Sequence, residues 1–547
     1  MNDIGSLVVH MLDETTKTSV RLFAPELVLS GTIVVMLLCR ILPVVWRVPT
    51  QWIALLGAFS AFGLALCQFS QLMPPDPTTP PILHPTPIFT GLLMFDQFGT
   101  FFRMLLSLFL ILTITLTVLT GIPDREDAPD FYTLLLGATI GLMIMASANH
   151  LLMLFLGVEM TSVPSYAMVG FLKGRKQSSE AALKYVVYGA GAAGVMLYGI
   201  SLLAGLTGTG SMPEMAERLA MIVGQGAGIG DPTVRTIVLA SLMVMVGLAF
   251  KLSVFPFHFW CPDAFEGAAA EVAGFLSVAS KAGAFALLVR FGLAFSGHSK
   301  EVSSIAFALG IGLGVLGAAT ATFGNLSAYG QSNMKRLLAY STIAHAGYML
   351  MSVSALMVLR FSKHANPEAV AEANAASLSC IEGLIYYLFV YLFMNLGAFA
   401  IVALIRNQIF SEELDDYNGL GTQCPVLCFG MTICVFSLIG LPPMGGFFAK
   451  FAIFYSVFKA TSVHWVMWFV LGAGAINTVF SLFYYIRILK AMYVKPRPEG
   501  ARKVNYDLMP VGLFVLMICL PVLGLGLFPA RFTETFNHVA SVLLTGR

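Results

Sequence analysis

Charged residues are scarce in this 547-residue sequence: Asp, Glu, Lys and Arg make up only 11% of it, whereas hydrophobic residues make up 57%. A soluble globular protein carries about 25% charged residues, so this chain has too little polar surface to cover a water-soluble fold of its length. Its net charge of +2 gives no basic patch of the kind that binds nucleic acid. The composition therefore excludes a soluble fold and indicates no nucleic-acid partner.

Paired cysteines are also missing, since none of the eight cysteines forms a CxxC motif. Cys424 and Cys428 are one helical turn apart, but Cys434 would point away from them. Small buried hydrophobic residues are the favoured interpretation over a metal or cluster site. We therefore expect no metal ion and no redox cofactor in this chain.

Apolar runs of about 20 residues recur along the chain, and each is long enough to cross a hydrocarbon core of about 30 Å. Lipid offers the backbone no hydrogen-bond partner, so such runs form helices. The sequence predicts an all-α polytopic membrane protein with about 14 transmembrane helices. We expect the spans at residues 24–45, 51–72, 96–120, 131–148, 150–172, 180–206, 235–256, 271–295, 302–323, 334–358, 380–405, 424–458, 464–491 and 507–530.

Basic residues set the expected orientation. With an even number of spans both termini lie on one side, and Lys and Arg are more numerous in the connections of the opposite side. Cytoplasmic loops are the ones enriched in Lys and Arg. We therefore expect both termini on the outer side of the membrane.

Four ionisable residues stand out within predicted spans because mostly apolar or small residues flank each of them on both sides; charge at membrane depth is costly and by default marks an ion pathway. They are Glu159, Lys251, Lys281 and Lys450. A buried salt bridge that fixes helix packing is the alternative for any one of them, but three lysines cannot all pair with one glutamate. An ammonium without a partner in low dielectric tends to lose its proton, which suits a site that accepts and releases protons.

Two histidines are further candidates. His345 lies inside the span at 334–358, and His258 follows Lys251 closely. A histidine on an apolar helix is usually a hydrogen-bonded core residue, but its near-neutral titration also suits a proton relay. We expect His345 to lie between Lys281 and Lys450. The tyrosines in YAMVGF, FYTLLL and LFYYIR are expected to be packing residues or interface anchors.

Helix breakers interrupt two spans. Pro256 follows Lys251, and Pro442, Pro443 and two glycines precede Lys450. Broken helices at corresponding positions of two halves are typical of transporters built from inverted repeats. The breaks fall in spans 7 and 12, so we expect two inverted five-helix repeats, spans 4–8 (131–295) and spans 9–13 (302–491). Spans 1–3 (24–120) and span 14 (507–530) would complete one membrane domain.

The residues around these sites resemble a known family. The runs are LFLGVEMTSVPSYAMVGF, KLSVFPFHFWCPDAFEG, GFLSVASKAGAFALL, GNLSAYGQSNMKRLLAYSTIAHAGYML and GLPPMGGFFAKFAIF. They resemble the antiporter-like, Mrp-type membrane subunits of bacterial NADH–quinone oxidoreductase (respiratory complex I), and among them subunit N. Lys450 favours N, because the subunit M pattern has a glutamate there. The resemblance covers about residues 130 to 490.

The resemblance implies a role for each site residue. Glu159 and Lys251 would be the pair that takes up protons, and Lys281 would be the central relay lysine. His345 would connect it to Lys450, the lysine of the second half-channel. NADH, FMN, iron–sulfur clusters and quinone would be bound by other subunits, and partners would include subunits M, K and J in a bacterial inner membrane.

One stretch departs from the family. After the EG pair the family usually has a PTPV-like run, whereas this chain has three alanines followed by Glu271 and Val272. Glu271 is either a surface residue or an added member of the proton network. Two alternatives for the whole chain remain, a subunit of an Mrp-type cation/proton antiporter or related membrane complex, and a purely structural membrane subunit.

Overall fold

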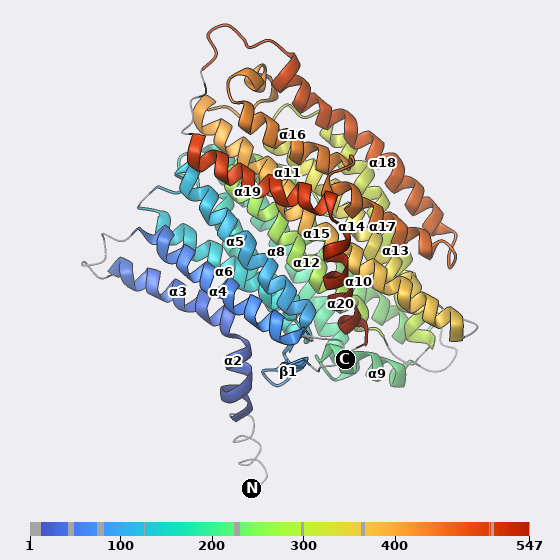
Figure 1. The fold of residues 1–547 in the computed structure, drawn as a ribbon. Coiled ribbons are helices and arrows are strands. Elements are labelled where there is room, and N and C mark those ends of the chain that lie inside the picture. Colours follow the sequence, from blue (N-terminus) through green and yellow to red (C-terminus); the bar gives the residue numbers. More distant parts are fainter. Residues whose placement is uncertain are drawn as a thin grey trace.

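Long helices cross the bundle side by side in this computed structural model, from α3 at one edge to α18 at the other (Figure 1). The structure describes residues 13–41, 49–73, 81–124, 126–223, 230–296, 300–362, 367–502, 504 and 508–545. Thirteen helices of this part are long and apolar enough to cross a membrane, and a fourteenth is counted if a bent helix pair is one span. The prediction of an all-α protein with about 14 spans is confirmed.

The membrane-length helices agree with the predicted spans to within a few residues, except that one begins thirteen residues earlier than expected, at Pro367. They are α3 (Ala24–Ile41), α4 (Thr50–Leu72), α5 (Gln97–Thr120), α6 (Ala128–Ser147), α7 (Leu151–Val169), α8 (Lys176–Thr207), α10 (Pro232–Leu252), α12 (Ala270–Leu293), α13 (Lys300–Ala328), α14 (Met334–Phe361), α15 (Pro367–Ile409), α18 (Val466–Leu489) and α19 (Leu508–Leu527). The predicted end at 42–45 and the predicted start at 507 lie outside the described residues.

Both predicted helix breaks are present. Helix α10 ends at Leu252, and α11 (Trp260–Gly267) begins after the segment that contains Pro256. The span expected at 424–458 is divided into α16 (Pro425–Ile439) and α17 (Gly445–Ala460) by the two prolines between them. Because proline removes a helical donor and clashes with the preceding turn, each helix ends before its proline and a new one starts beyond it.

Several shorter elements were not predicted. They are η1 (Thr15–Ser19), α2 (Val20–Leu22), the hairpin β1 (Thr86–Ile88) and β2 (Leu93–Phe95), α9 (Met212–Ile222), η2 (Leu414–Tyr417), η3 (Leu420–Thr422), η4 (Lys490–Val494) and α20 (Ala530–Thr545). Both α9 and α20 are too short and too polar to register as spans. They lie at the same end of the bundle as the hairpin (Figure 1).

Burial divides the helices into a core and a periphery. The most apolar stretches of α12 and α14 are completely buried, and that of α15 is 94% buried, against 28% for α3 and α18. Lys281 and His345 therefore lie on helices that protein surrounds on all sides. Polar side chains at this depth are tolerated because neighbouring helices and internal water can satisfy them.

Glycines bring α13 and α14 into close contact around His345. A Cβ on Gly324 would lie 2.6 Å from the backbone nitrogen of Ala344, and one on Gly347 would lie 2.5 Å from that of Ala321. Small residues at helix interfaces allow such close approach in membranes. This packing fixes the height and rotation of α14, and with it the position of the histidine.

Candidate functional site

Glu159 and Lys251 come together from α7 and α10, but they do not form a direct ion pair. The Lys251 ammonium donates a hydrogen bond to the Ser162 hydroxyl, with 3.1 Å between Nζ and Oγ. Ser162 lies one turn after Glu159 on α7, and the carboxylate acts on the ammonium electrostatically. Lys251 is fully buried, and Oε1 of Glu159 is a buried atom with no hydrogen-bond partner among the described residues. The carboxylate of Glu159 and the ammonium of Lys251 are therefore neighbours, with no direct ion pair between them.

Lys281 lies in the middle of α12 and is fully buried. Its ammonium donates a hydrogen bond to Ser253, with 3.0 Å between Nζ and Oγ. Ser253 caps the C-terminal end of α10 with φ at 58°, a conformation that non-glycine residues adopt uncommonly. The Trp260 ring centroid lies 5.5 Å from the ammonium, within cation–π range. Both contacts therefore depend on the break between α10 and α11.

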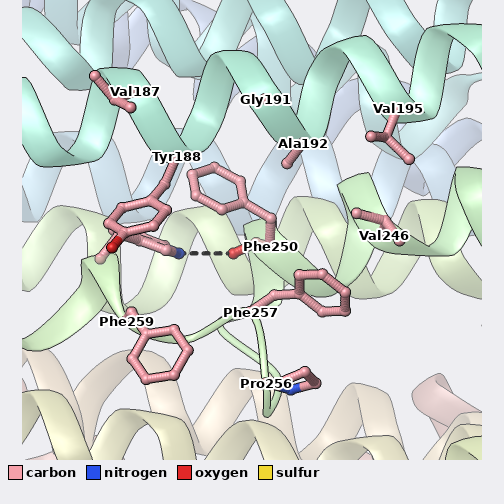
Figure 2. A pocket seen from close by; sticks show the side chains of 11 residues that line it. Val187, Tyr188, Gly191, Ala192, Val195, Val246, Phe250, Pro256, Phe257 and Phe259 are labelled. Atoms are coloured by element: carbon pink, nitrogen blue, oxygen red, sulfur yellow. Dashed lines mark hydrogen bonds between the residues drawn. The ribbon is translucent and has the colours of Figure 1, made fainter.

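An aromatic wall separates Lys281 from the outer surface of the bundle. Trp260 stacks on Tyr185 with 4.1 Å between ring centroids, and its indole N–H donates to the carbonyl of Phe250 at 2.9 Å. An apolar pocket of about 390 Å³ lies against this wall and is lined by exposed side chains (Figure 2). These include Val187, Tyr188, Phe257 and Phe259. The wall keeps the lysine among polar groups of the interior.

His345 is held between two tyrosine hydroxyls in the middle of α14. Its Nδ1 lies 2.5 Å from the Tyr387 oxygen, and its Nε2 lies 3.2 Å from the Tyr485 oxygen. Tyr485 shares a further hydrogen bond with Ser341, one turn before the histidine. These partners come from α15 and α18, so the imidazole links three helices. A ring with a partner at each nitrogen can take a proton on one side and release it on the other.

For the tyrosines of LFYYIR, expected to be packing residues or interface anchors, burial excludes the second alternative. Tyr484 and Tyr485 are both completely buried, so neither is an interface anchor. Tyr484 donates a hydrogen bond to Asn325 at 3.1 Å, and Tyr485 contacts His345. Sequence reasoning missed them because a tyrosine in an apolar run has the same pattern whether it faces lipid or the core.

Lys450 lies beside the break between α16 and α17. Its ammonium donates to the carbonyl of Ile439 at 2.9 Å, one of the carbonyls that the end of α16 leaves unpaired. It also lies 4.9 Å from the ring centroid of Tyr348, whose ring in turn is 5.8 Å from that of His345. The negative end of a helix dipole favours a cation at such a position. The structure thus brings Lys450 and His345 together through one tyrosine.

A polar stripe on α15 connects the two halves of the site. Tyr387, Tyr391 and Asn395 follow one another at four-residue spacing, which puts them on one helix face. Asn395 donates a hydrogen bond to Ser277 of α12 at 2.7 Å, and the Tyr391 ring lies 5.3 Å from that of His345. The spacing in IYYLFVYLFMN is the signal that could have revealed this stripe in the sequence.

Replacing Tyr391 by Phe tests the stripe. The Tyr391 hydroxyl is fully buried and makes no direct hydrogen bond within the described part of the chain, although Thr342 and Asn395 lie close to it. We expect Tyr391→Phe to slow proton transfer by roughly three- to tenfold, which corresponds to the loss of one hydrogen bond of about 1 kcal/mol from the hydroxyl to a bridging water. The measurement is NADH-driven acidification of vesicles that contain the assembled complex.

Tyr386→Phe is the matched control for this substitution. Tyr386 lies on the same helix, but its hydroxyl donates to the carbonyl of Leu525 on α19. This variant should pump at the unaltered rate. Equal rates for Tyr391→Phe and the unaltered chain would remove the hydroxyl from the path.

His258 occupies a different environment from the other candidates. It is 2% exposed, and its ring lies 4.2 Å from the centroid of Phe323 and 4.4 Å from that of Phe259. Its Nδ1 is buried and has no hydrogen-bond partner among the residues the structure describes. The structure does not bring it into contact with the lysines, and its role in proton transfer stays a prediction.

Glu271 is not a surface residue. Its side chain is 2% exposed in the first turn of α12, so that interpretation is wrong. The stretch Ala268–Ala270 is buried with it, because small side chains allow α12 to begin inside the protein.

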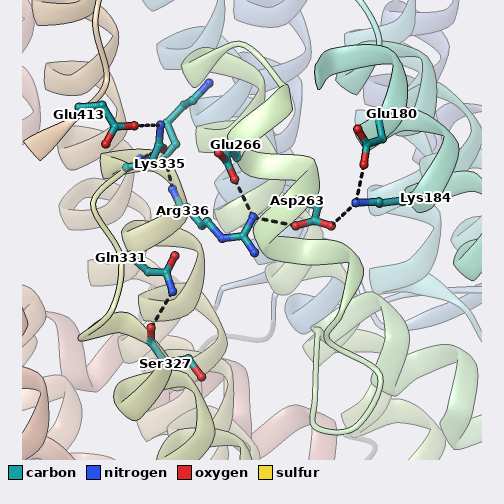
Figure 3. A network of polar contacts seen from close by, with 10 residues as sticks. Glu180, Lys184, Asp263, Glu266, Ser327, Gln331, Lys335, Arg336 and Glu413 are labelled. Carbon is teal, nitrogen blue, oxygen red and sulfur yellow. Dashed lines mark hydrogen bonds and ion pairs between the residues drawn. The ribbon is translucent and has the colours of Figure 1, made fainter. Parts of the chain in front are cut away.

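A network of ion pairs joins α8, α11 and α14 at one end of the bundle (Figure 3). Arg336 binds Asp263 at 2.7 Å and Glu266 at 2.6 Å, and Lys184 binds Asp263 at 2.9 Å and Glu180 at 2.8 Å. These groups are 26–66% exposed, so each pair contributes little stability. The network nevertheless connects the second half of a broken span to the helix that carries His345.

Two buried ion pairs were not predicted from the sequence. Nε of Arg103 lies 2.6 Å from Oε1 of Glu26, with both side chains at 0% exposure. Arg290 of α12 lies 2.6 Å from Asp96, the residue that caps α5. Both acids are close to span ends, where a charge is not unusual, so they did not stand out. In the described part of the chain, no three His, Cys, Asp or Glu side chains gather as metal ligands.

Known proteins are similar to this chain in sequence and in architecture. The family described as "NADH:quinone oxidoreductase/Mrp antiporter, TM" matches residues 148–362 and 370–481. NADH-quinone oxidoreductase subunit N of Anaeromyxobacter sp. is 38% identical over 546 residues, covering 96% of this chain and 97% of that protein. A second protein of that name, from Desulfitobacterium hafniense, is 37% identical over 456 residues, with 83% and 86% covered.

Solved structures of related complexes contain chains with a similar fold. A chain of respiratory complex I from Thermus thermophilus with bound aureothin has a TM-score of 0.71 and 28% identity, covering 93% of this chain and 98% of its own length. A chain of the Mrp complex from Dietzia sp. has a TM-score of 0.73, with 96% and 98% covered, but only 18% identity. The latter shows similarity of fold alone.

Proposed function

The chain belongs to the NADH:quinone oxidoreductase/Mrp antiporter transmembrane family, and we propose that its buried lysines carry the protons that the complex pumps. It is an antiporter-like, proton-pumping membrane subunit of an NADH–quinone oxidoreductase, and the part of the chain that the structure describes holds no complete active site of its own. Other membrane subunits of that complex are its partners.

The proposal rests on the burial of the three lysines and on the uncharged partners of their ammonium groups. Lys251, Lys281 and Lys450 are each 3% exposed or less. Within the described residues, no carboxylate oxygen lies within 4.0 Å of any of their ammonium groups. Each donates to a neutral serine or carbonyl oxygen instead. A purely structural role predicts salt bridges here, because an unpaired buried charge costs several kcal/mol; an amine that gives up its proton avoids that cost.

We assign each residue one step of the transfer. Glu159 and Lys251 take up the proton, and separation of this pair lets Lys251 discharge toward Lys281. From Lys281 the proton passes along Tyr391 to His345, and then beside Tyr348 to Lys450. Serine, asparagine and tyrosine side chains hold the water that joins these groups.

We further propose how the chain is organised and placed. Residues 131–295 and 302–491 form two inverted five-helix repeats, each with its break in the fourth span. The chain lies in a bacterial inner membrane with both termini on the periplasmic side. Subunits M, K and J are its neighbours, and NADH, FMN, iron–sulfur clusters and quinone bind elsewhere in the complex.

Purification through a tag on this chain tests the function. The purified complex should contain NADH-oxidising subunits and, in liposomes with quinone, should acidify one compartment when NADH is added. Replacing sodium by choline should leave that rate unchanged, since the carriers are proton-exchanging groups. Recovery without NADH-oxidising subunits, together with sodium movement against protons, would instead identify an Mrp-type antiporter.

A further inference from the structure

Glu271 is a buried acid on the same helix as the central lysine, and the proposed relay makes no use of it. Its Oε1 is buried and lacks a hydrogen-bond partner in the part of the chain that the structure describes. The groups that act on the carboxyl are Thr120 of α5, Lys335 of α14 and Arg406 of α15. The N-terminus of α12 also favours a negative charge there. The carboxyl therefore lies at a junction of four helices with hydrogen-bonding capacity to spare.

One side of this junction leads to the surface. Lys335 is 1% exposed and binds Glu412 at 2.9 Å, while also donating to the carbonyl of Ala268 at 2.6 Å. Glu412 is 15% exposed and Arg406 is 17% exposed, so water reaches both. Lys335 immediately precedes Arg336 of the ion-pair network in Figure 3. Polar groups therefore connect Glu271 to the surface at this end of the bundle.

The other side leads along α12 toward Lys281. Residues 271, 274, 277 and 281 fall on one helix face, and α15 packs against it. A Cβ on Gly274 would lie 3.2 Å from Phe399, and Ser277 accepts a hydrogen bond from Asn395. Oδ1 of Asn395 and Oγ of Ser280 are buried and unpartnered among the described residues. Orphaned polar atoms of this kind are where internal water binds.

We propose that Glu271 is a proton-carrying residue that connects Lys281 to the surface beside Lys335 and Glu412. The inference rests on the proposed function, because it supplies protons to the same central lysine. It gives this chain a second access route, distinct from the one through Glu159 and Lys251.

The transfer balances without any change in oxidation state. The Glu271 carboxylate takes a proton from a hydronium ion at the Glu412 end, so that an O–H bond of the hydronium breaks, a water molecule is left, and an O–H bond forms on the carboxyl. That carboxyl O–H bond breaks when the proton moves to water bound at Oδ1 of Asn395, which is unpartnered among the described residues. The excess proton then binds the Lys281 amine and forms an ammonium. A helix rise of 1.5 Å per residue puts the two residues about 15 Å apart along the axis, so the intervening water is required.

Infrared spectroscopy of the purified, assembled complex separates this role from a structural one. A Glu271 that only holds an ion pair stays ionised and gives no carboxylic C=O band. A proton carrier gives a band that appears during a pH titration, shifts in D2O, changes position in Glu271→Asp and is absent in Glu271→Gln. Since the Asp variant keeps the carboxylate, this comparison does not depend on the folding of the Gln variant.

Proton pumping in liposomes provides the second readout. We expect Glu271→Gln to lower the rate of NADH-driven acidification at least about tenfold. This loss is smaller than the 10²–10⁴-fold contribution of a proton-transfer group to a rate, because water offers a partial bypass. Glu271→Asp should retain most of the rate. Glu382→Gln is the matched control, since Glu382 is a half-buried acid in the N-terminal half of α15, bound to Asn537, and this variant should pump normally.

The absence of the band, or full pumping by an assembled Glu271→Gln complex, would overturn the inference. Failure of the proposed function is distinguishable, because it would show as normal pumping in Lys281→Met. If Lys281→Met stops pumping while Glu271→Gln pumps normally, the relay stands and only the access route through Glu271 is wrong.

Discussion

Lys281→Met should abolish proton pumping while leaving the complex assembled. The lysine is fully buried, and its ammonium contacts Ser253 and the Trp260 ring; among the residues that the structure describes it has no salt bridge for the substitution to break. Methionine fills a similar apolar volume but cannot carry a proton. We expect NADH-driven acidification to fall by at least about a hundredfold, the lower value for loss of a proton-transferring side chain. Native gels report assembly, and a pH-sensitive dye in vesicles reports pumping.

Lys281→Arg separates proton transfer from charge. Arginine keeps the positive charge and can still stack on Trp260, but a guanidinium does not release its proton under physiological conditions. If the lysine acts only through its fixed charge, the Arg variant should pump. The relay requires that it fail as completely as the Met variant. Normal pumping by either assembled variant would refute the relay.

Glu26→Gln should destabilise the first three spans strongly, because it leaves the Arg103 guanidinium buried without a counter-charge. Both side chains are 0% exposed, and besides Glu26 the guanidinium reaches the carbonyl of Leu22 at 3.4 Å. Removing one partner of such a pair costs about 3–5 kcal/mol. The expected result is a lower thermal unfolding midpoint of the purified complex and less of this chain in membranes.

The double variant Glu26→Gln/Arg103→Met provides the decisive comparison. Replacing both members of a buried pair by neutral residues is often neutral, so the double variant should recover most of the stability that either single variant loses. Asp415→Asn is the exposed control, since Asp415 is 82% exposed in its pair with Lys495 and such pairs contribute little. Additive losses in the double variant would show that the two side chains act independently.

Local sequence signals predicted the spans well, because hydropathy over about 20 residues and the positions of prolines are properties of the chain itself. They placed both breaks, beside Lys251 and Lys450, within the correct spans. They missed α9 and α20, because 11 and 16 residues are too few for a span and their polar faces lower the mean hydropathy.

Tertiary contacts decided the rest of the site. Glu271 is placed inside the protein by the packing of α5, α14 and α15, which its own sequence neighbourhood does not reveal. The tyrosines around His345 are another example, since Tyr387 and Tyr485 come from helices far apart in sequence. His258, which follows Lys251 by seven residues, instead lies among phenylalanine rings.

The sequence by itself determined that this protein crosses the membrane many times and where its helices break. Only the tertiary structure decided which side chains meet the ionisable residues of the spans. The physical reason is that lipid is as apolar as a protein interior, so a spanning helix has no strong hydrophobic face to show how it is rotated. Rotation is set by close packing between helices, as at Gly324 and Gly347, and it determines that the lysines face serines, carbonyls and a stripe of tyrosines.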